Sequence, residues 1–194
     1  MPRITAIVLA AGLSRRMGEK DKLFLPIGCK PMVKCVIDEV TNSQVFETII
    51  VTSKKTHQKL EGCDRRVLNE DSASGMTSSI QMGILAASHH SEAYMICLGD
   101  MPFIQTTTYN EIINGYTDRN QSQIVVPYHK KSKGNPVIFS ADFREELLAC
   151  QEKEGCRSVI QNNSHLVDKI QLDDPTILRD IDTEEDYRGL IGNV

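Results

Sequence analysis

Short apolar runs that alternate with helical segments constrain this chain more than any other feature of its sequence. ITAIVLA at residues 4–10, ETIIVTS at 47–53 and AYMICLG at 93–99 lack regular polar alternation, which is typical of strands buried on both faces. Apolar residues at helical spacing fill the intervals at 31–40, with Pro in the first turn, and at 76–90. This order predicts an α/β protein with a mainly parallel sheet covered by helices on both faces.

Shorter segments extend the same pattern to the end of the chain. Thr183 and Asp186 have the spacing of a capping box, so a last helix is expected to begin there. The remaining expected elements are a short helix around 56–61, a strand at 65–70, a helix near 107–119, a strand pair at 123–129 and 135–140 joined by the basic loop KKSKG, two further helices, and a strand within 165–172.

Composition limits the kind of protein this can be. The 194 residues, 40% hydrophobic and 25% charged, fit one globular domain spanning 1–194. A net charge of −4 argues against a general nucleic-acid binder, and no apolar stretch approaches the length of a membrane span. The six cysteines form no CxxC pair, which favours reduced thiols and a cytoplasmic location.

Charge is distributed unevenly along the chain. Residues 1–37 carry seven Lys or Arg against two acids, whereas residues 165–194 carry three basic residues against eight acids. This asymmetry suits a cleft with an anion on one side and a metal on the other, and it equally suits two solvated surfaces.

The segment after the first strand has the features of an anion-binding loop. Ala10, Ala11 and Gly12 are small enough for backbone N–H groups to approach a ligand, while Ser14, Arg16 and Lys22 supply donors and positive charge. In sheets of this kind, ligands bind beyond the carboxyl ends of the strands. The spacing excludes a P-loop, and GxGxxG is absent. We therefore expect a triphosphate site in a loop of another type.

Asp100 is a candidate magnesium ligand. Asp100 directly follows the apolar run 93–99, so it is expected at the ligand edge of the sheet. Mg²⁺ is typically held by one or two protein carboxylates together with phosphate oxygens. An Asp in this position also commonly forms a turn or caps a helix.

Five segments in order along the chain resemble the MobA-like nucleotidyltransferases, and most of all the molybdenum cofactor cytidylyltransferases of that group. They are LAAGLSRRMG at 9–18 followed by Lys22, GMTSSIQMG at 75–83, LGDMPFI at 98–104, GNPVIF at 134–139 and DIDTEEDY at 180–187. The resemblance implies the three-layer, Rossmann-like fold of nucleotide-diphospho-sugar transferases, with a mixed but mainly parallel sheet.

The resemblance also implies roles for particular residues. Arg16 and Lys22 would act on the triphosphate, and Mg²⁺ would be held by Asp100 together with Asp182, which competes with a capping role for that residue. Gly134, Asn135 and Arg157 would lie on the acceptor side. The nucleotide would be contacted by Leu9, Ala10, Ala11, Gly12, Ser14, Arg16, Lys22, Gly75, Ser78 and Ser79.

The implied reaction transfers CMP from CTP to the phosphate of molybdenum-loaded molybdopterin and releases pyrophosphate. Ala11 carries the choice of base, because LAAG accompanies cytidylyl transfer in this family and LAGG accompanies guanylyl transfer. One segment departs from the family pattern: EKEGCR at 152–157 stands where the cytidylyl group usually has GDxGAR. The departure replaces a Gly-Asp pair beside the expected acceptor site and puts the acceptor in question.

Three alternatives remain open from the sequence. The first is guanylyl transfer to molybdopterin, and the second is cytidylyl transfer to a sugar or alcohol phosphate, because a fold does not fix its acceptor. The third is a non-catalytic accessory protein that delivers the cofactor to a molybdoenzyme such as a xanthine dehydrogenase.

Overall fold

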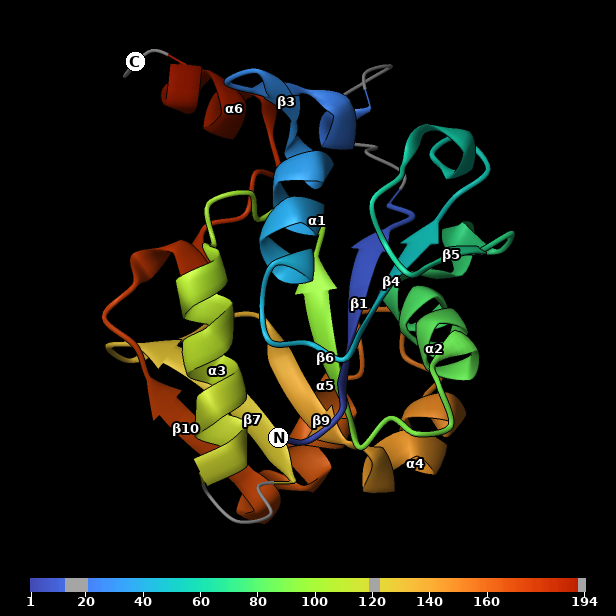
Figure 1. Ribbon diagram of the computed structural model, residues 1–194, viewed down its shortest axis with the longest axis vertical. Coiled ribbons are helices and arrows are strands. Elements are labelled where there is room, and N and C mark those ends of the chain that lie inside the picture. The colour runs from blue at the N-terminus through green and yellow to red at the C-terminus, as the bar shows by residue number, and fades with distance from the viewer. Residues whose placement is uncertain (13–20, 119–122, 192–194) are drawn as a thin grey trace.

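The computed structural model describes residues 1–12, 21–118 and 123–191, which form a mixed sheet between two layers of helices (Figure 1). Ser14 and Arg16 lie outside the described residues. The eight-stranded sheet has the order β10-β7-β9-β6-β1-β4-β5, with β8 paired to β7. Its strands are β1 (Ile4–Ala10), β4 (Glu47–Thr52), β5 (Arg65–Leu68), β6 (Ala93–Leu98), β7 (Ile124–His129), β8 (Ser132–Lys133), β9 (Val137–Ser140) and β10 (Val167–Gln171).

Four parallel strands form the half of the sheet that carries the first apolar runs. β1 pairs in parallel with β4 and β6, and β4 pairs in parallel with β5. β9 runs antiparallel to both β6 and β7, while β10 is parallel to β7. The expected three-layer fold with a mainly parallel mixed sheet is therefore confirmed.

Alternating side chains of each strand enter two separate cores. Ala6 and Val8 of β1 pack toward α1 (Met32–Thr41) and α3 (Thr106–Asp118), whereas Ile7 packs toward the opposite face. That opposite face is covered by α2 (Met76–Ala86), α4 (Arg144–Ala149) and α5 (Arg157–Asn162). Burial on both faces explains why the strands lack polar alternation.

Several predicted elements differ in detail from the structure. The helix expected at 56–61 is a single 3-10 turn, His57–Lys59, and the helix expected to reach residue 90 ends at Ala86. Pro31 precedes α1 instead of occupying its first turn: it belongs to β3 (Lys30–Pro31), which pairs with β2 (Pro26–Ile27). The extended backbone of Pro31, with ψ 142°, explains this, because a strand residue cannot also be helical.

The predicted strand pair and the predicted last helix are both present. β7 and β9 pair through Ile124 with Phe139, while the basic loop between them contains β8, which folds back on β7. α6 (Glu184–Ile191) begins with the expected capping box. The Thr183 amide donates to Asp186 Oδ2 over 2.8 Å, and the Asp186 amide donates to Thr183 Oγ1 over 3.1 Å. No helix within the described ranges is long and apolar enough to cross a membrane.

Candidate functional site

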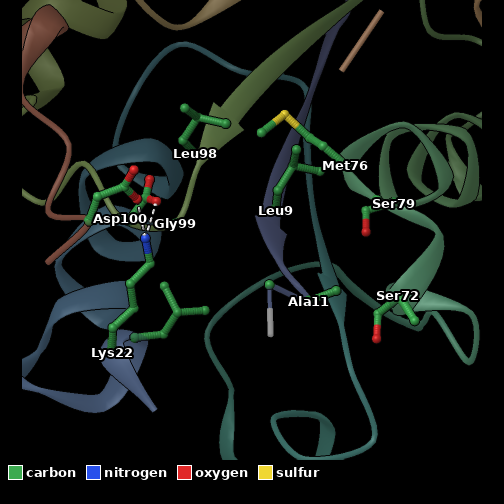
Figure 2. A pocket seen from close by; sticks show the side chains of 14 residues that line it. Leu9, Ala11, Lys22, Ser72, Met76, Ser79, Leu98, Gly99 and Asp100 are labelled. Carbon is green, nitrogen blue, oxygen red and sulfur yellow. Dashed lines mark hydrogen bonds and ion pairs between the residues drawn. The ribbon is translucent and has the colours of Figure 1, made fainter. Parts of the chain in front are cut away.

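A cavity of about 420 Å³ opens beyond the carboxyl ends of β1 and β6, the edge where ligands bind in sheets of this type. Figure 2 shows side chains converging on it from β1, from the end of β6 and from the start of α2. Its lining residues are Leu9, Ala11, Gly12, Lys22, Leu23, Ser72, Ala73, Gly75, Met76, Ser79, Leu98, Gly99, Asp100 and Asp182.

Gly99 allows the two strand ends to meet closely. Its amide donates to the Leu9 carbonyl over 3.1 Å, and a Cβ on Gly99 would lie only 2.6 Å from that oxygen. Any larger residue would push the loop after β6 away from β1. Asp100 is therefore held directly beside the small residues that follow β1.

Lys22 joins the two carboxylates that the sequence singled out. Its Nζ donates to Asp100 Oδ2 over 2.8 Å and to Asp182 Oδ1 over 2.7 Å (Figure 2 shows Lys22 reaching toward Asp100). The Lys22 side chain is only 13% exposed, against 20% for Asp100 and 38% for Asp182. Burial alone would lower the pKa of the Lys22 ammonium, but Asp100 and Asp182 outweigh burial and raise it.

The second carboxylate oxygen of Asp100 is unusual. Asp100 Oδ1 is buried and has no hydrogen-bond partner within the described part of the chain. A buried carboxylate oxygen in that state is costly unless a cation or donor satisfies it. With Asp182 beside it, the pair offers the hard oxygen ligands that Mg²⁺ prefers.

Protein ligands alone would not fill the coordination sphere of a metal here. Among residues 1–12, 21–118 and 123–191, no group of three or more His, Cys, Asp or Glu side chains is arranged to hold a metal. Two carboxylates fit Mg²⁺, which usually keeps several waters and shares phosphate oxygens of its substrate. The donor set therefore suits a metal that arrives with a phosphate ligand.

The C-terminal segment brings Asp182 to the site. The Ile181 amide donates to the Asp100 carbonyl over 3.0 Å, and the buried Ile181 packs with Met32 and Tyr187. The Tyr187 hydroxyl donates to the Pro26 carbonyl over 2.8 Å, which fastens α6 to the hairpin of β2 and β3. These contacts explain how a residue 160 positions from Lys22 reaches its ammonium.

The two serines at the start of α2 play different parts. Ser79 is buried and lines the cavity, whereas Ser78 lies outside the lining and donates to the Gly75 carbonyl over 2.9 Å. The buried Asn69 Nδ2 donates to both hydroxyls over 3.0 Å. Both hydroxyls therefore tie the start of α2 to Asn69. Of the two serines, only Ser79 also lines the cavity.

The segment at 152–157, which departs from the family pattern, makes local hydrogen bonds. Glu152 turns toward α5, where its Oε1 accepts from the Ser158 amide over 2.8 Å and from the Ser158 hydroxyl over 2.9 Å. Those hydrogen bonds, the one from the amide first, lower the pKa of Glu152. Lys153 packs through its backbone, since its carbonyl accepts from the Met76 amide over 2.8 Å. Neither side chain lines a cavity described here.

A second cavity, of about 600 Å³, contains all three expected acceptor-side residues, Gly134, Asn135 and Arg157. Met76 and Leu98 line both cavities, so the two adjoin at this wall. Apolar side chains contributed by β6, β9 and α2 form part of its surface, including Ile96, Phe139 and Ile80.

Positive charge dominates the second cavity. Lys133, Arg157 and Lys169 line it, with Glu154 as the only acid among its lining residues. The pKa of Lys133 is lowered, first by burial and then by the nearby Arg157 guanidinium. Lys169 Nζ lies 5.3 Å from the centre of the Tyr128 ring.

The sequence identified some lining residues and missed others. Leu9, Ala11, Gly12, Gly75, Ser79, Asp100, Asp182 and Lys22 all line the first cavity, while Ala10 is fully buried beneath it. Sequence reasoning did not identify Ser72, Ala73, Leu98 or Lys169 as lining residues. Lys169 lies on a half-exposed strand whose pattern carries no signal of a binding role.

The family model described as "MobA-like NTP transferase domain" matches residues 6–169 of the chain. The chain belongs to the MobA-like NTP transferase family. The match contains every strand of the sheet except the outer residues of β1 and β10, and it includes Lys22 and Asp100. Membership supports an enzyme of the nucleotidyltransferase class.

Curated relatives of this MobA-like chain differ in their names. A nicotine blue oxidoreductase from Paenarthrobacter nicotinovorans is 26% identical over 98% of both chains. A probable molybdenum cofactor guanylyltransferase from Mycobacterium avium is 26% identical over 97% of this chain and 95% of its own. A molybdenum cofactor cytidylyltransferase from Escherichia coli is 24% identical over 96% of this chain and 95% of its own.

Solved structures support the fold of this MobA-like chain over its whole length. Rv0371c from Mycobacterium tuberculosis superposes with a TM-score of 0.83 at 24% identity, covering 99% of this chain and 100% of its own. A structure of Rv0371c in complex with manganese gives a TM-score of 0.77 at 23% identity, with the same coverage.

Proposed function

We propose that the protein transfers CMP from CTP to the phosphate of molybdenum-loaded molybdopterin and releases pyrophosphate. One observation carries the transferase part of this proposal. Lys22 and its two carboxylate partners, Asp100 and Asp182, line a cavity that adjoins a second, positively charged cavity. Such a pair of adjoining sites suits a nucleotide and an anionic acceptor. Membership in the MobA-like family supports the same reaction class.

The nucleotide is proposed to bind in the first cavity. Ala11 and Gly12 leave room for the triphosphate near the backbone after β1, and Leu9 and Ala10 hold that backbone in place. Gly75 and Ser79 close the cavity from α2, with Ser78 supporting them through its hydrogen bond. Ser14 and Arg16 are proposed to add donors from outside the described residues.

Magnesium is proposed to bind at Asp100 and Asp182. The buried, unpaired Asp100 Oδ1 supports this assignment, as does the carboxylate of Asp182 beside it. When bound, Mg²⁺ would neutralise charge on the phosphate oxygens of the nucleotide. Rv0371c, which shares this fold, has been solved in complex with manganese.

Catalysis is proposed to rest on positioning and charge stabilisation. A phosphate acceptor is already ionised near neutral pH, so the reaction needs no general base. Lys22 and Arg16 would stabilise the charge that develops as pyrophosphate leaves. On the acceptor side, Arg157 would bind an anionic group, while Gly134 and Asn135 shape the cavity near the wall shared with the nucleotide.

The cytidylyl assignment rests on Ala11 within LAAG, and the relatives leave guanylyl transfer open. The relative from Escherichia coli is named as a cytidylyltransferase and the one from Mycobacterium avium as a guanylyltransferase, at similar identity. The relative named as an oxidoreductase adds the alternative that a related fold binds a redox substrate.

Domain organisation and location complete the proposal. We treat residues 1–194 as one nucleotidyltransferase domain, because Asp182, which follows the family match, contacts Lys22 within it. A cytoplasmic location is supported by six cysteines that are all free thiols. A molybdoenzyme such as a xanthine dehydrogenase would receive the finished cofactor.

Thermal stabilisation by CTP, GTP, ATP and UTP, each with and without Mg²⁺, tests the proposal. A nucleotide at 100 times its Kd adds about 2.7 kcal/mol to the free energy of unfolding. We expect Mg²⁺-dependent stabilisation by CTP, followed by turnover with molybdenum-loaded molybdopterin. Preference for GTP would indicate guanylyl transfer, and turnover only with sugar or alcohol phosphates would replace the acceptor. Stabilisation by no nucleotide would favour an accessory or redox role.

A further inference from the structure

The Lys22 ammonium lies between Asp100 Oδ2 and Asp182 Oδ1, the two carboxylate oxygens that a bridging divalent cation would use. It contacts one oxygen of Asp100 at 2.8 Å and one of Asp182 at 2.7 Å, and so bridges carboxylates from distant parts of the chain. A metal held by both carboxylates and the ammonium cannot occupy the space between them together. A metal that bridges these same two oxygens would therefore require the ammonium to move away.

We propose that Lys22 is an exchangeable cation that keeps divalent metal out of the site until a nucleotide arrives. The inference rests on the proposed function, because that function places a metal at Asp100 and Asp182. In the nucleotide-free protein the ammonium holds the two carboxylates together. The oxygens of a bound triphosphate would attract the ammonium, and Asp100 and Asp182 would then hold a metal that also needs phosphate oxygens as ligands.

Charge favours this exchange over simple coexistence. Two carboxylates so close together would repel each other without a cation between them. The ammonium balances one of their two charges, whereas a divalent cation balances both. The four negative charges of a triphosphate offer the displaced ammonium a new partner, so neither cation is left unpaired.

The chain around Lys22 allows its side chain to move while its backbone stays fixed. Lys22 begins a 3-10 turn, Lys22–Phe24, in which Leu23 is 3% exposed and Phe24 stacks with Lys59 at 5.1 Å. Four rotatable carbon bonds let a lysine ammonium swing through several ångströms. The proposed exchange would move the ammonium through a change of side-chain rotamer.

The site is open on the side where the exchange would occur. The Asp182 side chain is 38% exposed, and Asp100 is 20% exposed with its free Oδ1 buried. Because Asp182 is the more exposed of the two, a hydrated metal would meet it before Asp100 as the ammonium withdraws. This order keeps Asp100, the less accessible ligand, paired at every stage.

Binding of Mn²⁺ in the absence of nucleotide, followed by electron paramagnetic resonance, tests the exchange. We expect Lys22→Met, which removes the charge at similar length, to bind Mn²⁺ at least tenfold more tightly than the unaltered protein. Lys22→Arg keeps a cation and should bind as weakly as the unaltered protein. Lys34→Met is the matched control, because it breaks a lysine–carboxylate pair with Asp38 outside the site.

A melting experiment without nucleotide gives a second readout. Lys22→Met should melt at a lower temperature than the unaltered protein in EDTA and recover with Mn²⁺, because the metal replaces the missing ammonium. The unaltered protein should melt at the same temperature in EDTA and in Mn²⁺. Equal Mn²⁺ affinity in folded Lys22→Met and in the unaltered protein would overturn the exchange.

If Lys22→Met does not fold, a measurement on the unaltered protein alone still tests the exchange between Lys22 and the metal. Without nucleotide, Mn²⁺ should not broaden the amide NMR signals of Asp100 and Ile181 at concentrations that do so once α,β-methylene-CTP is added. Broadening without nucleotide would overturn the exchange and leave the proposed metal site intact. No broadening under either condition would instead contradict the metal site of the proposed function.

Discussion

Where the first cavity holds one lysine between two carboxylates, the second holds three cations and one acid, yet the two share Met76 and Leu98. In the first cavity, each described charge has a partner of opposite sign. In the second, burial and then the like charge of Arg157 lower the pKa of Lys133. This difference in charge is the basis for the proposal that the first cavity takes a nucleotide with its metal and the second takes an anionic acceptor.

Replacing Asp100 should produce the largest effect, and it tests the role proposed for the first cavity. We expect Asp100→Asn to abolish Mg²⁺-dependent stabilisation by CTP and to slow transfer by roughly a hundredfold or more, because a carboxylate proposed to hold the charge-neutralising metal is lost. Isothermal titration with CTP and a turnover assay measure both quantities. Glu154→Gln, which alters the acid of the second cavity, should leave CTP binding unchanged; loss of CTP binding there would contradict separate roles for the cavities.

Removing cations from the second cavity should affect the acceptor alone. Arg157→Met and Lys133→Met are each expected to raise the KM for the acceptor by about tenfold or more, since charged hydrogen bonds to a bound anion are lost. The Kd for CTP should not change. Steady-state kinetics with varied acceptor, beside calorimetry with CTP, separates the two. A rise in the CTP Kd with an unchanged acceptor KM would reverse the assignment of the cavities.

The backbone at the boundary between the cavities should be sensitive to glycine substitution. Gly75 has φ +110° and Gly155 has φ +89°, and a Cβ on either would lie within 2.6 Å of Lys153 or Met76 atoms. Alanine at either position should therefore lower the free energy of unfolding by about 1–3 kcal/mol. Urea unfolding measures this loss.

Gly189 provides the matched control for these glycine variants. It lies in α6, and a Cβ there would meet no atom of the described residues within 4 Å. Gly189→Ala should stabilise the protein by roughly 0.5–1 kcal/mol. Equal stability changes at Gly75, Gly155 and Gly189 would show that the boundary is not constrained by its backbone.

The smallest effect, a pH dependence, should distinguish the lysines of the two cavities. Burial and Arg157 lower the folded-state pKa of Lys133, whereas the pKa of Lys22 is raised by its carboxylates despite burial. Lys133 should thus lose its proton below pH 10.5 and weaken anion binding as the pH rises. The effect on stability runs the other way from the effect on anion binding. Between the lowered pKa and pH 10.5, the unfolded state binds more protons than the folded state, so the free energy of unfolding should rise with pH.

NMR titration of the lysine side-chain carbons checks this order. Lys133 should titrate before Lys22, and Arg157→Met should move the Lys133 pKa upward by removing the neighbouring positive charge. Titration of Lys133 at the same pH as an exposed lysine, in both proteins, would contradict the proximity of the two cations.

Much of the fold could be predicted because burial on both faces leaves a plain signal in the strands. The position of Asp100 followed from the rule that ligands gather at strand ends, and the capping box identified the start of α6. The 3-10 turn at His57–Lys59 was harder, because short polar segments carry little periodic signal. The placement of Pro31 in the first turn of a helix was wrong, because proline suits both the end of a short strand and the start of a helix.

The site was less predictable because it depends on contacts between distant segments. The pairing of Asp182 with Lys22 requires the Ile181–Asp100 and Tyr187–Pro26 hydrogen bonds, and local sequence encodes neither. The orientation of Glu152 toward Ser158 likewise emerges only from packing. Lys169 enters the second cavity through the pairing of β10 with β7, which no local pattern shows.

The bond between Tyr187 and Pro26 has a consequence for biosynthesis. Proteins emerge from the ribosome N-terminus first, and domains begin to fold as their segments become available. Every strand of the sheet precedes residue 172, yet Asp182 and its anchor at Tyr187 are made later. A nascent or prematurely terminated chain could therefore assemble the sheet while lacking one of the two carboxylates. Synthesis of the segment that contains Asp182 and Tyr187 therefore supplies the second carboxylate only after the strands of the described sheet have been made.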